Sequence, residues 1–354
     1  MLKFRIVECI EDFENLRSNW DDVFKNDTKA TVFQSWSWLR GWIEVIGGNW
    51  LIISVHLESE SRYIAFLPLY KDSQPGLFGI RNYSTLKMAG EPLADYSGML
   101  CLPQYENEVI EKIATYLSDK MRWNRFNMRN ISDTRIIQIA RRIALKKYDV
   151  QYGRKTPCPR LNLPDSWEQY VAEILDPKYS KKLKSKLKKA EKRGLYTSGV
   201  NDENLELYLQ HFLKLHEMRW GLMDEQKKQL FTSTFKWLYL ANLLRMDVLW
   251  YDNKPIAIQV SFMDRRKKIF LFYNGGWDSD YAHLSPGIVL HGHCINYAIE
   301  NGYKVYDFMR GGESYKYLFG AVNKYNRNIV ITANTLESIL RKIKARMIGS
   351  TSKA

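Results

Sequence analysis

The stretch Lys268–Tyr317 most constrains the fold, because it alternates strand-like, loop-like and helix-like patterns within one short span. Ile269–Tyr273 is an apolar and aromatic run of strand length, which we expect to end at Asn274-Gly275-Gly276. Ser285-Pro286-Gly287 predicts a helix start, with a hydroxyl able to cap and a proline at the first helical position. An apolar face then recurs at helical spacing until Asn301-Gly302.

A second short strand is expected at Lys304–Met309, followed by the turn Arg310-Gly311-Gly312-Glu313. A crossover of this length places its two strands parallel, with the helix packed over them. The first amides of the helix from Pro286 have no partners within it, so they favour an anion at that end. We therefore predict a phosphate-bearing ligand across the loop 274–286, approached by Arg310. The alternative is a purely structural crossover.

Two motifs in this half carry a family resemblance. Ser285-Pro286-Gly287 is followed by Asp307-Phe308, Arg310-Gly311 and Tyr315-Lys316 in the pattern D-F-x-R-G-x-x-x-Y-K. This resembles the CelD-like group of GNAT-related acyltransferases, which are distant relatives of the Fem peptidoglycan aminoacyltransferases. FQSWSWLRGW from Phe33 and ADYSG from Ala94 are similar to the first half of the same group. The resemblance implies a mixed α/β fold of two tandem GNAT-like (acyl-CoA N-acyltransferase) domains.

The length of 354 residues favours two domains over one core. Tyr148–Leu163 holds Pro157 and Pro159 and shows no helical period, so we expect a changeover there. The predicted division is an N-terminal GNAT-like domain at 1–155, a C-terminal one carrying the donor site at 156–345, and a flexible tail at 346–354. Both halves show strand, helices, hairpin, strand, helix and strand in a similar order.

Acyl transfer by this group, as the resemblance implies, needs orientation, a proton acceptor and donors for developing negative charge rather than a covalent nucleophile. The candidate catalytic residues are Asp307, Glu313 and Asp95 as proton acceptors, Tyr273 and Tyr315 as proton donors, and Arg310 and Lys316 for a carboxylate or phosphate. The candidate cofactor-binding residues are Ser285, Pro286, Gly287, Ile288 and Arg310. Structural alternatives stay open: Asp307 as an ion-pair partner, the tyrosines as half-buried aromatics, and Asp95 as a turn residue.

The donor predicted from the resemblance is acyl-CoA, with acetyl-CoA as the first example. The stretch ahead of the helix departs from the wider Q/R-x-x-G-x-G/A pattern, since only Gly287 is present and a proline removes one amide. Aminoacyl-tRNA, used by the Fem relatives, is the alternative donor. We expect no metal: His291 and Cys294 share a helix face, but His293 points elsewhere, and a packed cysteine with partly exposed histidines fits better.

The net charge of +14 is concentrated in one segment. Lys178–Arg193 carries nine Lys/Arg and one acid, a net +8, on a predicted amphipathic helix. This predicts a solvated surface helix, a site for an anion such as tRNA or cofactor phosphates, or attachment to an acidic membrane. Four scattered cysteines, no membrane-length apolar run and an N-terminus unlike a signal peptide predict a cytoplasmic protein, with peripheral association at the inner membrane face as an alternative.

Together these features predict an N-acyltransferase that moves an acyl group from acyl-CoA to an amine of an amino sugar or cell-envelope or exopolysaccharide precursor. The alternatives are a Fem-like aminoacyl-tRNA-dependent transferase and a non-catalytic GNAT pair acting as a binding module. The acceptor amine and the oligomeric state are not encoded in these motifs.

Overall fold

The structure is a computed structural model that describes residues 1–58, 62–75, 82–146, 148–334 and 338. The chain divides into two compact units, one formed by Met1–Lys155 with Tyr325–Ala354 and the other by Thr156–Lys324. The sequence-based division assigned 156–345 to the second domain, whereas β13 (Val322–Ala333) pairs through Arg327–Thr332 with a strand of the first unit. The predicted tail at 346–354 lies outside the described residues.

The first unit is built around a sheet in the order β1-β2-β3-β4-β6, with β5 paired to β3. Its elements are β1 (Leu2–Val7), α1 (Ile10–Asn15), α2 (Arg17–Asn26), α3 (Trp36–Ile46), β2 (Trp50–Leu57), β3 (Tyr63–Gln74), β4 (Tyr83–Met88), β5 (Leu100–Cys101), α4 (Glu106–Thr115), β6 (Arg125–Ile131) and α5 (Thr134–Ala144). The pairs β1–β2, β2–β3 and β3–β4 are antiparallel, and β4–β6 is parallel.

The second unit repeats this order with β8-β9-β10-β11-β12. Its elements are α6 (Trp167–Gln169), α7 (Pro177–Lys192), β8 (Tyr196–Gly199), α8 (Leu205–Trp220), α9 (Glu225–Leu240), β9 (Leu244–Tyr251), β10 (Lys254–Asp264), β11 (Ile269–Trp277), α10 (Pro286–Glu300), β12 (Val305–Asp307) and α11 (Ser314–Leu318). The pairs β8–β9, β9–β10 and β10–β11 are antiparallel, and β11–β12 is parallel. The prediction of a mixed α/β fold with a tandem architecture is confirmed.

The two halves exchange their closing strands. β7 (Tyr148–Asn162) follows α5 of the first half, yet its residues Arg160–Asn162 pair with β12 of the second. β13 follows α11 of the second half, yet it pairs with β6 of the first. Each sheet is therefore extended by the strand that follows the other half's last helix.

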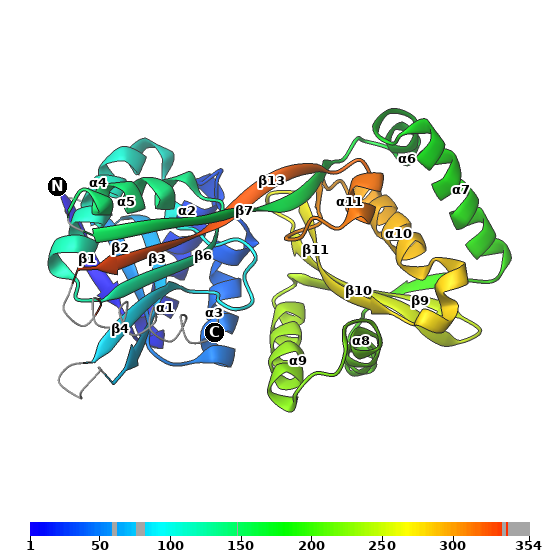
Figure 1. The fold of residues 1–354 in the computed structure, drawn as a ribbon, viewed down its shortest axis with the longest axis horizontal. Helices are drawn as coiled ribbons and strands as arrows, with labels where there is room; N and C mark the ends of the chain where they lie inside the picture. Colours follow the sequence, from blue (N-terminus) through cyan, green and yellow to red (C-terminus); the bar gives the residue numbers. More distant parts are fainter. Residues whose placement is uncertain (59–61, 76–81, 147, 335–337, 339–354) are drawn as a thin grey trace, which may run out of the picture. The chain divides into compact units, whose positions relative to one another are not determined.

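The core of the second unit explains why its helices form where they do. α10 buries Val289, Leu290, Ile295 and Ala298, which recur at helical spacing. α8 and α9 lie on one side of β10, and α10 lies on the other (Figure 1). α7, predicted as the basic helix, packs its apolar face against α10. The methyl groups of Leu187 lie 3.1 Å from where a Cβ on Gly292 would be.

One local expectation needs correction. β11 does not end at Asn274, because it continues through Gly275 and Gly276 to Trp277. A Cβ at Gly276 would lie 2.2 Å from the carbonyl oxygen of Leu215, so this glycine lets α8 approach the strand rather than breaking the strand. The changeover region around 148–163 is the long strand β7, and the two units divide within it, between Lys155 and Thr156. Its prolines are tolerated because Pro157 and Pro159 contribute only carbonyl acceptors, to Gly311 N and Phe308 N.

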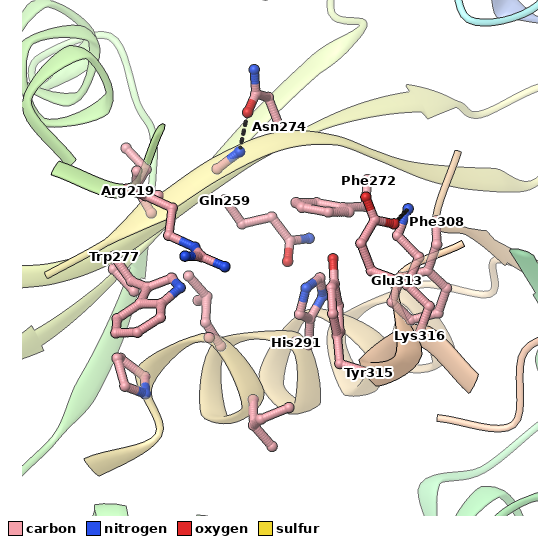
Figure 2. Close-up of a pocket in the computed structure, with 18 of the residues that line it drawn as sticks. Arg219, Gln259, Phe272, Asn274, Trp277, His291, Phe308, Glu313, Tyr315 and Lys316 are labelled. Atoms are coloured by element: carbon pink, nitrogen blue, oxygen red, sulfur yellow. Dashed lines mark hydrogen bonds and ion pairs between the residues drawn. The ribbon is translucent and has the colours of Figure 1, made fainter. Parts of the chain in front are cut away.

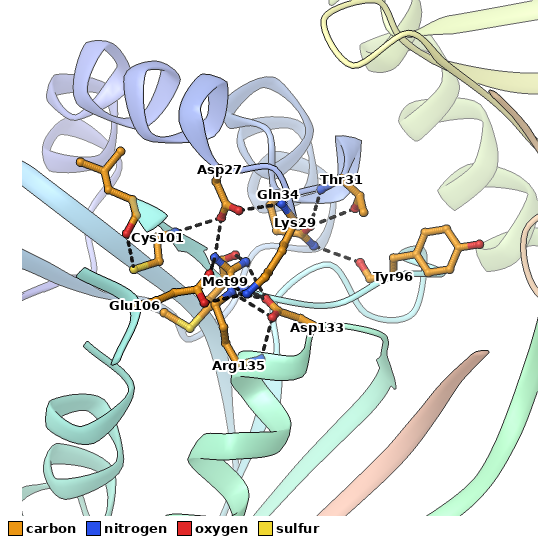
Figure 3. Close-up of polar contacts among 11 residues, drawn as sticks. Asp27, Lys29, Thr31, Gln34, Tyr96, Met99, Cys101, Glu106, Asp133 and Arg135 are labelled. Atoms are coloured by element: carbon orange, nitrogen blue, oxygen red, sulfur yellow. Dashed lines mark hydrogen bonds and ion pairs between the residues drawn. The ribbon is translucent and has the colours of Figure 1, made fainter. Parts of the chain in front are cut away.

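A closed polar network lies inside the first unit (Figure 3). The fully buried Arg135 guanidinium donates to Asp27 Oδ2 at 2.8 Å and to Asp133 Oδ2 at 2.8 Å. Gln34 Nε2 donates to the Tyr96 carbonyl at 3.0 Å, which joins the FQSW segment to the ADYSG segment. In the first half, these two family-like segments therefore contact each other and build the interior of the unit.

Candidate functional site

The site lies where two parallel strands separate. β11 and β12 pair only over Ile269–Leu271 and Val305–Asp307. Beyond that point, Phe272–Trp277 of β11 and Phe308–Arg310 after β12 line the two sides of a pocket of about 600 Å³. The start of α10 and the polar residues of α11 complete the lining (Figure 2). All the lining residues belong to the second unit. This is an edge where a sheet opens, the usual place for a ligand in an α/β fold.

A β-bulge shapes the pocket wall. Val260 pairs with Asn274, but the next residue, Ser261, pairs with Phe272, so Tyr273 is the extra residue. The Tyr273 ring packs against Phe262 with ring centroids 4.3 Å apart and against a phenylalanine of α9. This places the ring on the side of the sheet that α8 and α9 cover. Tyr273 therefore lines the pocket without presenting its ring toward α10.

The start of α10 supplies main-chain donors. Ser285, Pro286, Gly287 and Ile288 all line the pocket, as the predicted cofactor-binding residues. The first intrahelical bond is that from Val289 N to Ser285 O at 3.1 Å, so the amides of Gly287 and Ile288 have no acceptor within the helix. With the helix dipole, these two amides suit an anion.

We expected the hydroxyl of Ser285 to cap the helix, but it does not. It adopts a left-handed conformation, with φ of 54° and ψ of 51°, and makes no side-chain capping bond. Its Oγ instead contacts Nζ of Lys186 on α7. The left-handed conformation turns the chain from the short helix Ser279–Leu284 into α10 and directs the serine toward the basic helix.

A buried polar chain leads to the pocket from the sheet. Gln259 Nε2 donates to Ser261 Oγ and to Tyr306 Oη, each at 2.9 Å. Tyr306 Oη lies 3.1 Å from His291 Nδ1. Because this hydroxyl already accepts from Gln259, its own proton is available to Nδ1. The neutral ring then carries its hydrogen on Nε2.

His291 is a pocket residue that sequence reasoning did not select. Burial, with a smaller effect from Lys316, lowers the pKa of His291 to about 3, so the ring is neutral. We expected partly exposed histidines in this helix, but His291 is buried by the rings of Phe272, Phe308 and Tyr315. The expectation was wrong for His291, because α10 turns this residue toward the sheet.

The loop after β12 is tightly held. Asp307 is buried, and its Oδ1 accepts from Met309 N at 2.8 Å. This bond holds Met309 at φ of 57°, a strained conformation for a residue with a side chain. Lys316 is 3% exposed and donates to the carbonyls of Arg310 and Gly311, at 3.0 and 3.1 Å, and to Glu313 Oε2 at 2.7 Å.

These contacts separate the predicted residues of this loop into two groups. The three N–H bonds of Lys316 are all used within the loop, and Asp307 is buried, so both side chains hold the loop; their catalytic roles stay predictions. Arg310 is exposed and lines the pocket, as do Glu313 and Tyr315. Burial, followed by the nearby Glu313, raises the pKa of Tyr315, so its phenol stays protonated at neutral pH.

The far wall holds a cationic and aromatic group that we did not predict. The guanidinium carbon of Arg219, near the end of α8, lies 5.2 Å from the ring centroid of Trp277 and 5.0 Å from that of Trp220. Trp220 Nε1 also donates to the Gly275 carbonyl at 3.1 Å. Arg219 stands in no motif, and only its neighbours in space mark it as a pocket residue.

Asp95 belongs to the first unit. Its carbonyl accepts from Asn326 Nδ2 at 3.0 Å. A catalytic role for its side chain stays a prediction. Within the described parts of the chain, no group of three or more His, Cys, Asp or Glu side chains is placed to hold a metal ion. Among the helices of those same parts, none is long and apolar enough to cross a membrane.

The sequence comparison places acyl-transfer chemistry in the unit that holds this pocket. Residues 177–317 match the protein family described as "Acetyltransferase (GNAT) domain". This match lies within the second unit, and the prediction of an acyltransferase enzyme is confirmed at this level. No curated protein matches the chain in sequence. The narrower CelD-like grouping is not established by this match.

Solved structures share the fold over nearly the whole chain. FemX is similar with a TM-score of 0.66 at 10% identity, covering 96% of this chain and 99% of that one. A tandem GNAT protein from the clavulanic acid biosynthesis pathway gives 0.54 at 11% identity, with 94% and 98% covered. L-PGS from Bacillus licheniformis gives 0.53 at 10% identity, with 94% and 96% covered. At these identities the likeness shows the fold.

Proposed function

We propose that the chain is a CelD-like N-acyltransferase that moves an acyl group from acyl-CoA, acetyl-CoA being the simplest, to an amine of an amino sugar or a cell-envelope or exopolysaccharide precursor. One observation carries the proposal: the separation of β11 from β12 opens a pocket lined by Gly287 and Ile288, whose amides have no acceptor within α10. An acyl-CoA whose thioester lies in the opening would place its phosphates at these amides. Acyl-CoA and charged tRNA are both made in the cytoplasm, and we propose that the protein is located there.

The pocket residues fit direct transfer. The amine attacks the thioester carbonyl carbon, the C–S bond breaks, and CoA leaves as a thiolate. The Nε2–H of His291 is a donor for the developing oxyanion, and its neutral state suits this task better than that of a base. The proton lost by the amine passes to Glu313, and the phenol of Tyr315 protonates the thiolate. The products are an amide and CoA.

A Fem-like transfer from aminoacyl-tRNA is the second candidate. The similarity to FemX over 96% of this chain favours it, as does the net +8 of Lys178–Arg193. The same pocket would then receive an ester carbonyl, and the basic helix would contact the phosphates of the RNA.

Ligand-induced stabilisation separates these candidates. We would measure the melting temperature of the full chain with acetyl-CoA, longer acyl-CoAs and charged tRNA. Acyl-CoA is expected to raise it in a concentration-dependent way, because a ligand that binds only the folded state stabilises it by mass action. Stabilisation by charged tRNA alone, lost at high salt, would favour the Fem-like candidate. A response to neither donor would leave a non-catalytic binding module.

A further inference from the structure

A second pocket, of about 350 Å³, lies between α7 and the start of α10. Its α7 wall carries four cations, Lys182, Lys186, Lys189 and Arg193, spaced by four, three and four residues and therefore on one helix face. The opposite wall is formed by His283, Leu284 and Ser285, immediately before α10. The apolar residues Leu183 and Leu187 on the neighbouring face fix α7 against α10, which holds the cations in place.

Among the described residues, no Asp or Glu forms an ion pair with any of the four cations. Lys186 Nζ instead contacts the neutral hydroxyl of Ser285. Burial, and then the neighbouring charges of Lys182 and Lys189, lower the pKa of Lys186. Cations held together in a partly enclosed space favour a bound anion, because it relieves their repulsion.

Ser285 belongs to the linings of both pockets, so the two pockets meet at the start of α10. Gly287 and Ile288 line only the main pocket, whereas His283 and Leu284 line only the cationic pocket, so the main pocket, the start of α10 and the cationic pocket follow one another. CoA has the same order of groups: the thioester, then the pyrophosphate, then the ribose with its 3′-phosphate. We infer that the cationic pocket binds the 3′-phosphate of the acyl-CoA donor. This inference rests on the proposed function.

The partly enclosed pocket fits a compact phosphate better than an extended surface. α7 carries other exposed lysines, including Lys181 and Lys188, that do not line the pocket, whereas Lys182 and Lys189, exposed as well, do line it. A membrane or an RNA backbone would use those outward lysines at least as much as the inward ones. The pair Lys181 and Lys188 has the same spacing as Lys182 and Lys189, so it provides a control with the same change of charge on the same helix.

The test compares the dissociation constants of CoA and 3′-dephospho-CoA by isothermal titration calorimetry. The wild-type chain is expected to bind CoA about tenfold more tightly, since charge-assisted hydrogen bonds are lost with the phosphate. In Lys182→Gln/Lys189→Gln this ratio should fall close to one, through weaker binding of CoA. In Lys181→Gln/Lys188→Gln it should stay close to the wild-type value. Higher salt should lower the ratio in the wild type.

Two outcomes overturn the inference and leave the proposed function intact. One is a wild-type chain that binds CoA and 3′-dephospho-CoA equally, and the other is an unchanged ratio in the Lys182→Gln/Lys189→Gln variant. Equal loss in both double variants would also overturn it, because general charge would then explain the effect. Binding of charged tRNA with no binding of either CoA form would remove both the inference and the proposed function.

Discussion

The two units share one structural feature, a pair of parallel strands that separates after a short pairing, and they use it differently. In each, two parallel strands pair over only three residues: Thr85–Lys87 with Arg125–Asn127 in the first unit, and Ile269–Leu271 with Val305–Asp307 in the second. In the first unit, the segment after β4 returns to β6, where Ser97 pairs with Ile131. In the second unit, the corresponding place is the pocket.

The ADYSG segment is what occupies the strand end in the first unit. Ser97 N donates to the Asn130 carbonyl at 3.0 Å, and Asn130 Nδ2 donates to the Ala94 carbonyl at 2.9 Å. The interior charge there is also fully paired, through Arg135, Asp27 and Asp133. In the second unit, the buried chain of Gln259, Tyr306 and His291 is neutral and leads to the pocket. A repeated fold therefore keeps one half as support and one half as the candidate site.

Loss of the buried arginine gives the largest expected effect. Arg135→Leu leaves two buried carboxylates without their cation, so we expect the free energy of unfolding to fall by about 3–5 kcal/mol. Urea denaturation followed by circular dichroism measures this. Arg142→Leu, on the same helix, removes an exposed ion pair with Glu111 and should cost less than about 1 kcal/mol. Similar losses in both variants would contradict the structural role of the first unit's network.

Arg310 tests whether the second unit is the active one. Arg310→Ala should lower turnover about 100-fold, because an electrostatic contact to the donor or transition state is lost. Thiol release from acetyl-CoA with a panel of amines measures turnover. The melting curve should stay nearly unchanged, since the side chain is exposed. A large fall in the melting temperature would make this arginine structural.

Gly276→Ala sharpens the comparison at the level of packing. The new Cβ would lie 2.2 Å from the Leu215 carbonyl oxygen, so we expect a loss of about 1–3 kcal/mol in the free energy of unfolding. Gly287→Ala is the control, because its Cβ would meet nothing nearer than 3.7 Å, and its stability should be almost unchanged. An equally stable Gly276→Ala protein would show that α8 does not need this close approach.

His291 predicts a pH dependence of stability. Its pKa is lowered from 6.5 to about 3 in the folded state, so the unfolded chain binds more protons between those values. Stability should therefore fall as the pH decreases through that window, by at most about 1.4 kcal/mol per pH unit for this group. His291→Gln should reduce the slope. The variant should not abolish the pH dependence of stability, because burial lowers the pKa of His216 to about 4 as well.

Local patterns predicted the elements of the second unit well, and spatial approach explains the failures. Ser285-Pro286-Gly287 does start a helix, and the basic segment is α7, because capping, proline geometry and apolar spacing act within a few residues. The end of β11 was misplaced because the role of Gly276 depends on α8, some 60 residues earlier in the chain.

The polar part of the site was predicted only where a motif marked it. Arg310 and Tyr315 stand at specified positions of the family-like pattern, Glu313 stands within its span, and all three line the pocket. His291, Gln259 and Arg219 do not stand in a motif, and they reach the pocket from a helix face, a strand interior and a helix end. A buried histidine at a helical position is indistinguishable in sequence from a packed one, so its hydrogen bond to Tyr306 had to come from the structure.

The exchange of β7 and β13 determines the order in which the two sheets can be completed during synthesis. The first sheet gains its neighbour for β6 only when Arg327–Thr332 has left the ribosome, although β6 itself was made some 200 residues before. Until then β6 has an open edge, a template for mispairing with another nascent chain. Cutting the gene between the halves would thus yield two fragments that each lack a strand, and co-expression of both should be needed to recover either.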